Sequence, residues 1–104
     1  MQKPSAKKQV GSSDAAGSLN RAALVLTTIA LGSNKGSLLT ELIARTGLPR
    51  TTVVRTLKAL QDLGWVKRDA DALRFNIGTD LAALGYSAIS RNPLARIAET
   101  DLSK

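Results

Sequence analysis

The sequence predicts a small, mainly helical domain that carries one β-hairpin. Three observations indicate this fold class. Apolar residues recur at three- and four-residue steps in several segments, as amphipathic helices require. Apolar and polar residues alternate strictly in Leu73-Arg74-Phe75-Asn76-Ile77, which is typical of a half-buried strand. Only three of the 104 residues are aromatic, so the core must be built mainly from Leu, Val, Ile and Ala.

The N-terminal third of the chain predicts a tail, a helix and a short strand. Residues 1–17 are rich in Lys, Ser, Gly, Ala and Gln, and we expect them to form a disordered basic tail. From Ser18, the expected N-cap, apolar spacing predicts a helix from about 19 to 31. The Gly-Ser-Asn-Lys-Gly run at 32–36 should end this helix, and 37–39 suggest a very short strand.

Two further helices are expected on either side of a Gly-Leu-Pro corner. Thr40 should cap the first of them, and Gly47 fits the left-handed residue that ends such a helix. The second should begin at Pro49, where the missing N–H would be unpaired anyway, and run to about Leu63. The expected buried stripe of this second helix is Val53, Leu57 and Leu60.

Residues 65–77 predict a β-hairpin with a short, turn-prone loop at 69–72. The alternation in the second strand predicts that Leu73, Phe75 and Ile77 face the core, which leaves Arg74 and Asn76 outside.

Beyond the hairpin the sequence predicts two helical segments. Thr79 should cap a linker helix at about 80–90, and Asn92-Pro93 would begin a short terminal helix at 94–102. The expected organisation is therefore a tail at 1–17, a folded domain at 18–78, and a linker helix with a short terminal helix at 79–104.

This order of elements is that of a winged helix-turn-helix, a three-helix core plus a β-hairpin wing, followed here by a linker helix. In such a domain the second helix of the motif lies in the major groove of DNA. On a helical wheel centred on Leu57, the side of residues 49–63 that faces away from the core bears hydroxyls and cations, with no carboxylate before Asp62. The residues of this helix expected to contact DNA are Arg50, Thr51, Thr52, Arg55 and Lys58.

The roles expected for these residues follow from their chemistry. A threonine hydroxyl can bond a phosphate or a base, and its methyl group can touch thymine. Arg55 lies about one turn into the helix, where a guanidinium can reach guanine O6 and N7. In the wing, Lys67, Arg68 and Arg74 are candidates for contacts with phosphate or the minor groove, and solvated charge is an equal alternative for them.

Charge and composition agree with a nucleic-acid partner. The formal net charge is +7, and residues 18–58 hold six cations against one carboxylate. A localised basic excess suggests an anionic partner, with solubility as the alternative. The chain has no Cys and no His, and its acids are scattered, so we expect no enzyme activity, metal or cofactor. No apolar run approaches about 18 residues and no secretory signal is evident, so a cytoplasmic protein is expected.

Three stretches carry a resemblance to a known family: "SLNRAALVLTTIA", "SLLTELIARTGLPRTTVVRTLKALQDLGWVKRD" and "RFNIGTDLAALG". In order and spacing they resemble the DNA-binding domain of IclR-type transcriptional regulators, over about residues 18–91. The resemblance implies a homodimer that binds double-stranded operator DNA, with a separate ligand-sensing domain after the linker helix. It maps the reading residues to 49–52 and Arg55, and it places Thr40 beside the DNA backbone. Val54 and Thr56 depart from the family pattern, which often has Tyr and Leu at these positions.

Two alternatives stay open at this point. The chain stops near where a ligand-sensing domain would begin, so it is either a fragment of a longer regulator or a stand-alone module. No effector pocket is expected within these residues. The second alternative is a winged-helix protein-interaction module without DNA binding, since one fold can serve unrelated functions.

Overall fold

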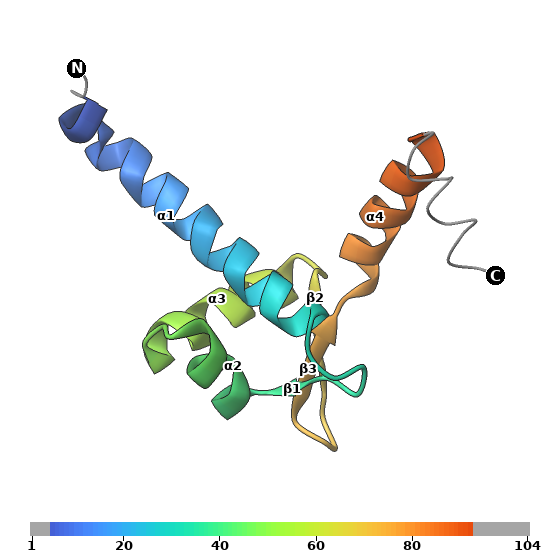
Figure 1. Ribbon diagram of the computed structural model, residues 1–104. Helices are drawn as coiled ribbons and strands as arrows, with labels where there is room; N and C mark the ends of the chain where they lie inside the picture. The colour runs from blue at the N-terminus through green and yellow to red at the C-terminus, as the bar shows by residue number, and fades with distance from the viewer. Residues whose placement is uncertain (1–4, 93–104) are drawn as a thin grey trace.

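The computed structural model describes residues 5–92, with side chains from residue 15 onward. Four helices surround a small antiparallel sheet (Figure 1). This arrangement confirms the predicted mainly helical, winged fold. The elements in chain order are α1 (Ser5–Ala30), β1 (Ser37–Leu38), α2 (Leu39–Thr46), α3 (Arg50–Asp62), β2 (Val66–Asp69), β3 (Arg74–Ile77) and α4 (Thr79–Arg91).

The core lies where α1, α2 and α3 meet the sheet. All three members of the predicted stripe on α3 are buried, which confirms that prediction. They pack with residues from each of the other core elements, and burial of such side chains contributes roughly 1.5–3 kcal/mol each. The buried apolar residues are Val25, Ile29, Leu42, Val53, Leu57, Leu60, Val66 and Phe75.

The sheet has the strand order β1-β3-β2, with all pairs antiparallel. The short strand expected after α1 is present, and Ser37 of β1 pairs with Phe75 of β3. The hairpin expected at 65–77 is present too, with Val66 opposite Ile77 and Asp69 opposite Arg74. The wing is thus tied to the segment that leads into α2 rather than being a free hairpin.

The hairpin turn differs from the expectation in one respect. Leu73 was expected to face the core, but it is 52% exposed and its backbone is left-handed, with φ of 55°. The reason is that β3 begins only at Arg74, so Leu73 belongs to the turn. The Asp69 carboxylate stabilises this turn by accepting hydrogen bonds from the N–H groups of Asp71 (2.9 Å) and Ala72 (3.1 Å).

All four predicted helix starts within the described residues differ from the structure. α3 begins at Arg50, with Pro49 as its N-cap rather than its first helical residue. α2 begins at Leu39 rather than after a Thr40 cap, because the Glu41 carboxylate accepts a hydrogen bond from the Leu38 N–H (2.8 Å) and closes the first turn. Thr79 is the first residue of α4, and Gly78 precedes it without a side-chain cap. Ser18 lies inside α1 instead of capping it.

The structure also differs from the expected disordered tail, because α1 extends continuously from Ser5. No proline interrupts the chain between Pro4 and Pro49, so nothing blocks the extension of this helix. Adding residues to an existing helix is far easier than starting one, because only the first turn carries the nucleation cost. The expected terminal helix at 94–102 lies outside the described residues.

The end of α3 is joined to the start of α4 by a close backbone contact. The N–H of Trp65 donates a hydrogen bond to the Leu60 carbonyl (2.9 Å), and the N–H of Gly64 donates one to the Gln61 carbonyl (3.0 Å). Gly64 adopts the left-handed conformation that commonly ends a helix, with φ of 78°. Gly78 then crosses this corner: its N–H donates to the Trp65 carbonyl (2.7 Å). The predicted helix end at Gly64 is confirmed, and α4 leaves the domain from that same corner.

Two helical segments project from the body of the domain. In Figure 1 the N-terminal part of α1 and the whole of α4 extend away from the core. α4 contains no buried residue, and the radius of gyration is 16.5 Å, against about 13 Å for a compact domain of this size. Neither helix has the length and apolarity together that a membrane crossing requires, and the same holds for the rest of residues 5–92.

Candidate nucleic-acid interface

The outward side of α3 is open and polar. Val53, Leu57 and Leu60 fix the orientation of this helix by burying its opposite side. As a result Thr51, Arg55 and Lys58 are exposed, as is the small Ala59. The next carboxylate on this side is Asp62, in the last turn. This surface presents one hydroxyl and two cations without an anion between them.

Thr52 departs from the expected arrangement because it is half-buried. It faces the side of α3 that lies along α1, where a hollow of about 280 Å³ separates the two helices. Ser18, Arg21 and Ala22 of α1 form the other wall of this hollow. Arg55 borders the same hollow, so its guanidinium lies at the edge between the open side of α3 and α1.

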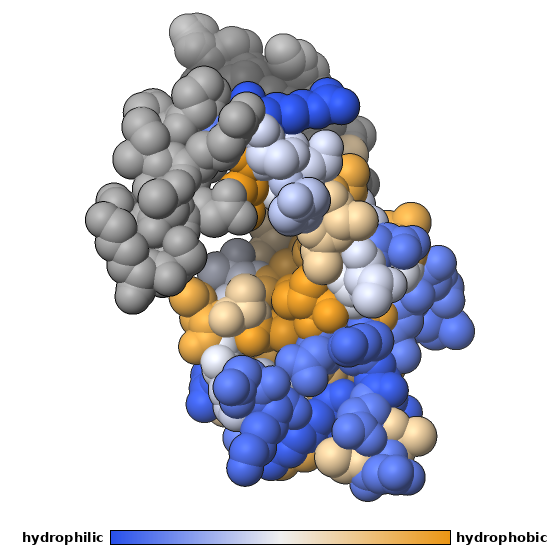
Figure 2. Space-filling view, turned by 90° about the vertical axis from the view of Figure 1, so that its right-hand side faces the viewer, coloured by the Kyte–Doolittle hydropathy of each residue, from blue (hydrophilic) through white to orange (hydrophobic). Residues whose placement is uncertain are grey.

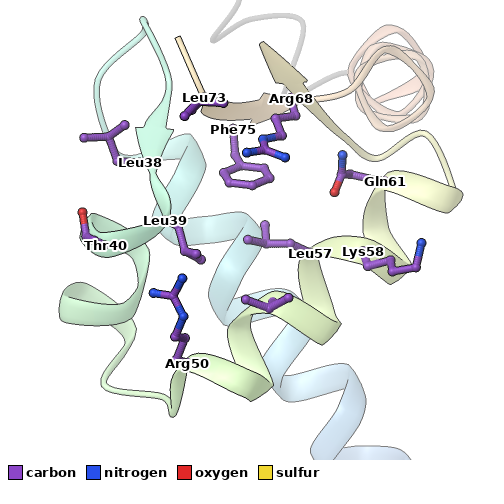
Figure 3. Close-up of a pocket in the computed structure, with 11 residues that line it drawn as sticks. Leu38, Leu39, Thr40, Arg50, Leu57, Lys58, Gln61, Arg68, Leu73 and Phe75 are labelled. Carbon is purple, nitrogen blue, oxygen red and sulfur yellow. The ribbon is translucent and has the colours of Figure 1, made fainter. Parts of the chain in front are cut away.

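The start of α3 offers a second polar region. Pro49 is the N-cap residue and lacks a capping side chain, so the first N–H groups of α3 have no side-chain partner from it. Arg50 is exposed at the first helical position, and Thr40 is exposed in the first turn of α2. Both side chains line the same hollow between α3 and the wing (Figure 3). Because a helix N-terminus favours negative charge, this region suits a phosphate.

The three cations expected to act together in the wing do not share one face. Strand alternation places Lys67 with its cross-strand partner Asn76 on one face of the hairpin, and Arg68 with Phe75 on the other. The Arg68 guanidinium carbon lies 5.6 Å from the centre of the Phe75 ring, a cation–π distance. Arg68 therefore lies on the face toward α3, whereas Lys67 lines a hollow beside the α1–β1 loop.

Arg74 was expected outside the core, as a candidate for contact with phosphate or the minor groove, and the structure shows its side chain bonded to other parts of the domain. Its Nη1 donates a hydrogen bond to the Gly36 carbonyl (3.0 Å) and lies 3.7 Å from Glu41 Oε1. The side chain is about one-third exposed. Since Glu41 also bonds the start of α2, Arg74 links the wing to α2 and acts as a structural group.

A feature that sequence reasoning missed is an apolar hollow of about 550 Å³ between α3, the β1–α2 segment and the wing (Figure 3). Its floor contains Leu39, Leu57 and Phe75, and Arg50 and Arg68 rise from opposite walls. The walls come from three separate segments, so no local sequence pattern marks the hollow. Leu73, in its left-handed turn conformation, is one of the residues that line the hollow.

Other kinds of site find no support within the part of the chain that the structure describes. That part holds no group of three or more Asp, Glu, His or Cys side chains arranged for a metal ion. Its one ion pair is Arg74 with Glu41.

Comparison with known proteins places the chain in a family. The family model of the IclR helix-turn-helix domain matches residues 18–70. The chain is similar to the crystal structure of an IclR transcriptional regulator from Alicyclobacillus acidocaldarius, with 31% identity and a TM-score of 0.70, over 83% of this chain and 34% of that one. It is also similar to an IclR family transcriptional regulator from Brucella abortus, with 26% identity and a TM-score of 0.62, over 80% of this chain and 31% of that one.

A third solved structure agrees in fold. HmgR from Pseudomonas aeruginosa has 24% identity and a TM-score of 0.68, over 80% of this chain and 34% of that one. No curated protein matches the chain. The chain spans about a third of the length of the three solved proteins. Because the family model covers half of the chain and the winged helix-turn-helix agrees in order and shape, the chain belongs to the IclR family.

Proposed function

We propose that this chain binds double-stranded DNA with sequence specificity, as the DNA-binding part of a transcriptional regulator. The observation that carries the proposal is the orientation of α3, with its aliphatic side buried and its hydroxyl- and cation-bearing side open. α3 is the second helix of the helix-turn-helix, the element that enters the major groove in proteins of this fold. The family of the chain and its solved neighbours support the same proposal.

We propose different roles for the candidate residues, with some contacting bases and others contacting phosphate. Thr51 and Arg55 project from the first turns of the open side of α3, the position from which side chains reach base edges. The residues suited to phosphate are Thr40, Arg50, Lys58 and Arg68. Thr52 is half-buried, so only its exposed part could contact DNA. Lys67 faces away from α3, and Arg74 positions the wing.

We further propose that the DNA-binding form is a homodimer assembled through α1 and α4. Both helices carry large apolar side chains that the domain leaves uncovered: Leu19 is 72% exposed, Leu84 56% and Ile89 39%. Figure 2, which views the α4 side of the molecule, shows apolar residues gathered across the middle of this face, above a hydrophilic lower part. Pairing two recognition helices would let the protein bind two half-sites about one helical turn apart.

The experiment that tests the proposal is selection of binding sites from random DNA duplexes. A homodimer of sequence-specific domains should enrich a two-fold symmetric sequence. Enrichment of a single, asymmetric half-site would contradict the dimer while keeping specific binding. Failure to enrich any sequence, with no salt-sensitive binding to duplex, would favour a protein-interaction module instead.

Replacing Arg55 by alanine should weaken binding to the selected duplex by about 1–3 kcal/mol and relax the preference at one base pair per half-site. The reason is that a guanidinium bound to guanine makes two hydrogen bonds that no other base pair offers. Fluorescence anisotropy on duplexes with all four bases at each position would measure both effects. Arg45→Ala is a matched control, because Arg45 is exposed in the last turn of α2, away from α3. Unchanged affinity and preference in Arg55→Ala would show that α3 is placed wrongly.

A further inference from the structure

The hollow between α3 and the wing combines an apolar surface with three cations. We propose that it is a binding site for an organic anion with an apolar body, such as an aromatic or aliphatic carboxylate. This goes beyond the proposed function, which assigns α3 and the wing to DNA alone.

The size and lining of the hollow suit a small molecule. Its volume of about 550 Å³ lies within the range of about 300–1,000 Å³ typical of ligand pockets, which are mostly apolar with a few placed polar groups. The aliphatic walls come from Leu39 and Leu57, and the Phe75 ring closes the space below Arg68 (Figure 3). A bare phosphate would leave this apolar surface without a partner, whereas an aromatic or aliphatic body would cover it.

The charges of the hollow select an anion. Three cations line it, Arg50, Lys58 and Arg68, and no carboxylate does. Arg50 and Arg68 come from opposite walls, and neither makes an ion pair with any described residue. Arg68 is held over the Phe75 ring at 5.6 Å, so its guanidinium is positioned before a ligand arrives. A carboxylate is therefore expected at the Arg68 guanidinium, since arginine binds this group through paired hydrogen bonds, with Arg50 and Lys58 adding positive charge to the hollow.

All three cations of the hollow, Arg50, Lys58 and Arg68, are also proposed phosphate contacts. An anion bound in the hollow would occupy them, and binding of the anion and of DNA should exclude each other. This regulatory part rests on the proposed function, whereas the binding site itself does not.

The test uses 2-naphthoate as the probe and the neutral 2-naphthamide as its matched control, in the absence of DNA. Methyl NMR signals of Val54 and Leu57 should shift and saturate with naphthoate, with a Kd on the order of 1 mM or tighter. The amide should bind about tenfold or more weakly, because it lacks the charge that the arginines recognise. Equal binding of the two compounds, no saturable shift, or shifts confined to the α1–α3 hollow would overturn the proposal.

Variants locate the anion within the hollow. Arg68→Gln should weaken naphthoate binding about tenfold or more, whereas Lys67→Gln, one residue away on the other face of the hairpin, should leave it unchanged. Both side chains are exposed, so neither change should prevent folding. Equal effects of the two variants would show that only general positive charge is sensed, and would overturn the site.

The mutual exclusion of anion and DNA is tested separately, by measuring binding of the selected duplex in the presence of naphthoate. Naphthoate at saturating concentration should displace the DNA, and simultaneous binding of both would overturn mutual exclusion. Duplex binding measured without naphthoate tests the proposed function alone, so the two proposals fail in distinguishable ways.

Discussion

Replacing Gly78 by alanine should lower the free energy of unfolding by about 3 kcal/mol, the upper end of the usual cost of overpacking. A Cβ atom at this position would overlap the Gly64 carbonyl oxygen and lie 2.8 Å from its carbonyl carbon. Backbone atoms cannot rotate out of the way as side chains can. The Gly78 N–H to Trp65 carbonyl bond and the Asp80 N–H to Gly64 carbonyl bond (3.1 Å) hold the two segments together and would have to lengthen. Thermal unfolding should show a loss of roughly 12–24 °C in Tm.

Gly85→Ala is the matched control. It is the same substitution, but nothing lies within 4 Å of a Cβ at this position in the interior of α4. Alanine favours the helix over glycine by about 1 kcal/mol, so this variant should unfold at the same or a slightly higher temperature. An unchanged Tm in Gly78→Ala would mean that the two backbones do not approach this closely in solution.

Raising the salt concentration from 50 to 200 mM should weaken binding to the selected duplex about 10³-fold or more, if about six phosphates are contacted. The cause is the release of counterions when cations of the protein neutralise phosphates. Arg50, Lys58 and Arg68 would supply three such contacts in each protomer of the proposed homodimer. The slope of log affinity against log salt concentration, measured by fluorescence anisotropy, gives the number of phosphates directly.

Two substitutions with the same change of charge separate contacting from solvated cations. Lys58→Gln should reduce the slope by about 0.9 for each phosphate contact it removes. Lys67→Gln should leave the slope as it is, because Lys67 lies on the hairpin face that points away from α3. If both variants changed the slope equally, the proposed side of the wing would be wrong.

Much of the fold could be predicted because its signals are local. The stripe of Val53, Leu57 and Leu60 depends only on helical periodicity, and it correctly oriented α3. Gly47 and Gly64 end their helices through short-range hydrogen bonds, which the sequence marks by glycine itself. The exposed residues Thr51, Arg55 and Lys58 followed from the same wheel, so the open face of α3 was predictable as well.

Most of the features that escaped prediction depend on contacts between distant segments. Arg74 is drawn inward by Gly36, 38 residues away along the chain, and no local pattern indicates that partner. Lys67 and Arg68 are neighbours in β2, so strand alternation alone separates them, but which of the two lies on the face toward α3 depends on how the hairpin packs on the rest of the domain. Thr40 lost its expected capping role because Glu41 reaches back to the Leu38 N–H instead. Thr52 is half-buried because it lies on the flank of α3 beside α1, where the hollow between the two helices is. A helical wheel of α3 alone does not show that α1 packs along this flank.

The joint between Gly64 and Gly78 has a mechanical consequence. Within residues 5–92, two backbone hydrogen bonds join the start of α4 to the residues that directly follow α3. Because α4 is a stiff helix held at its start, a sideways force on its C-terminal end produces a torque at the contact between Gly64 and Gly78. A force on the far end of α4 would therefore act on the residues that directly follow α3, the helix that we propose enters the major groove.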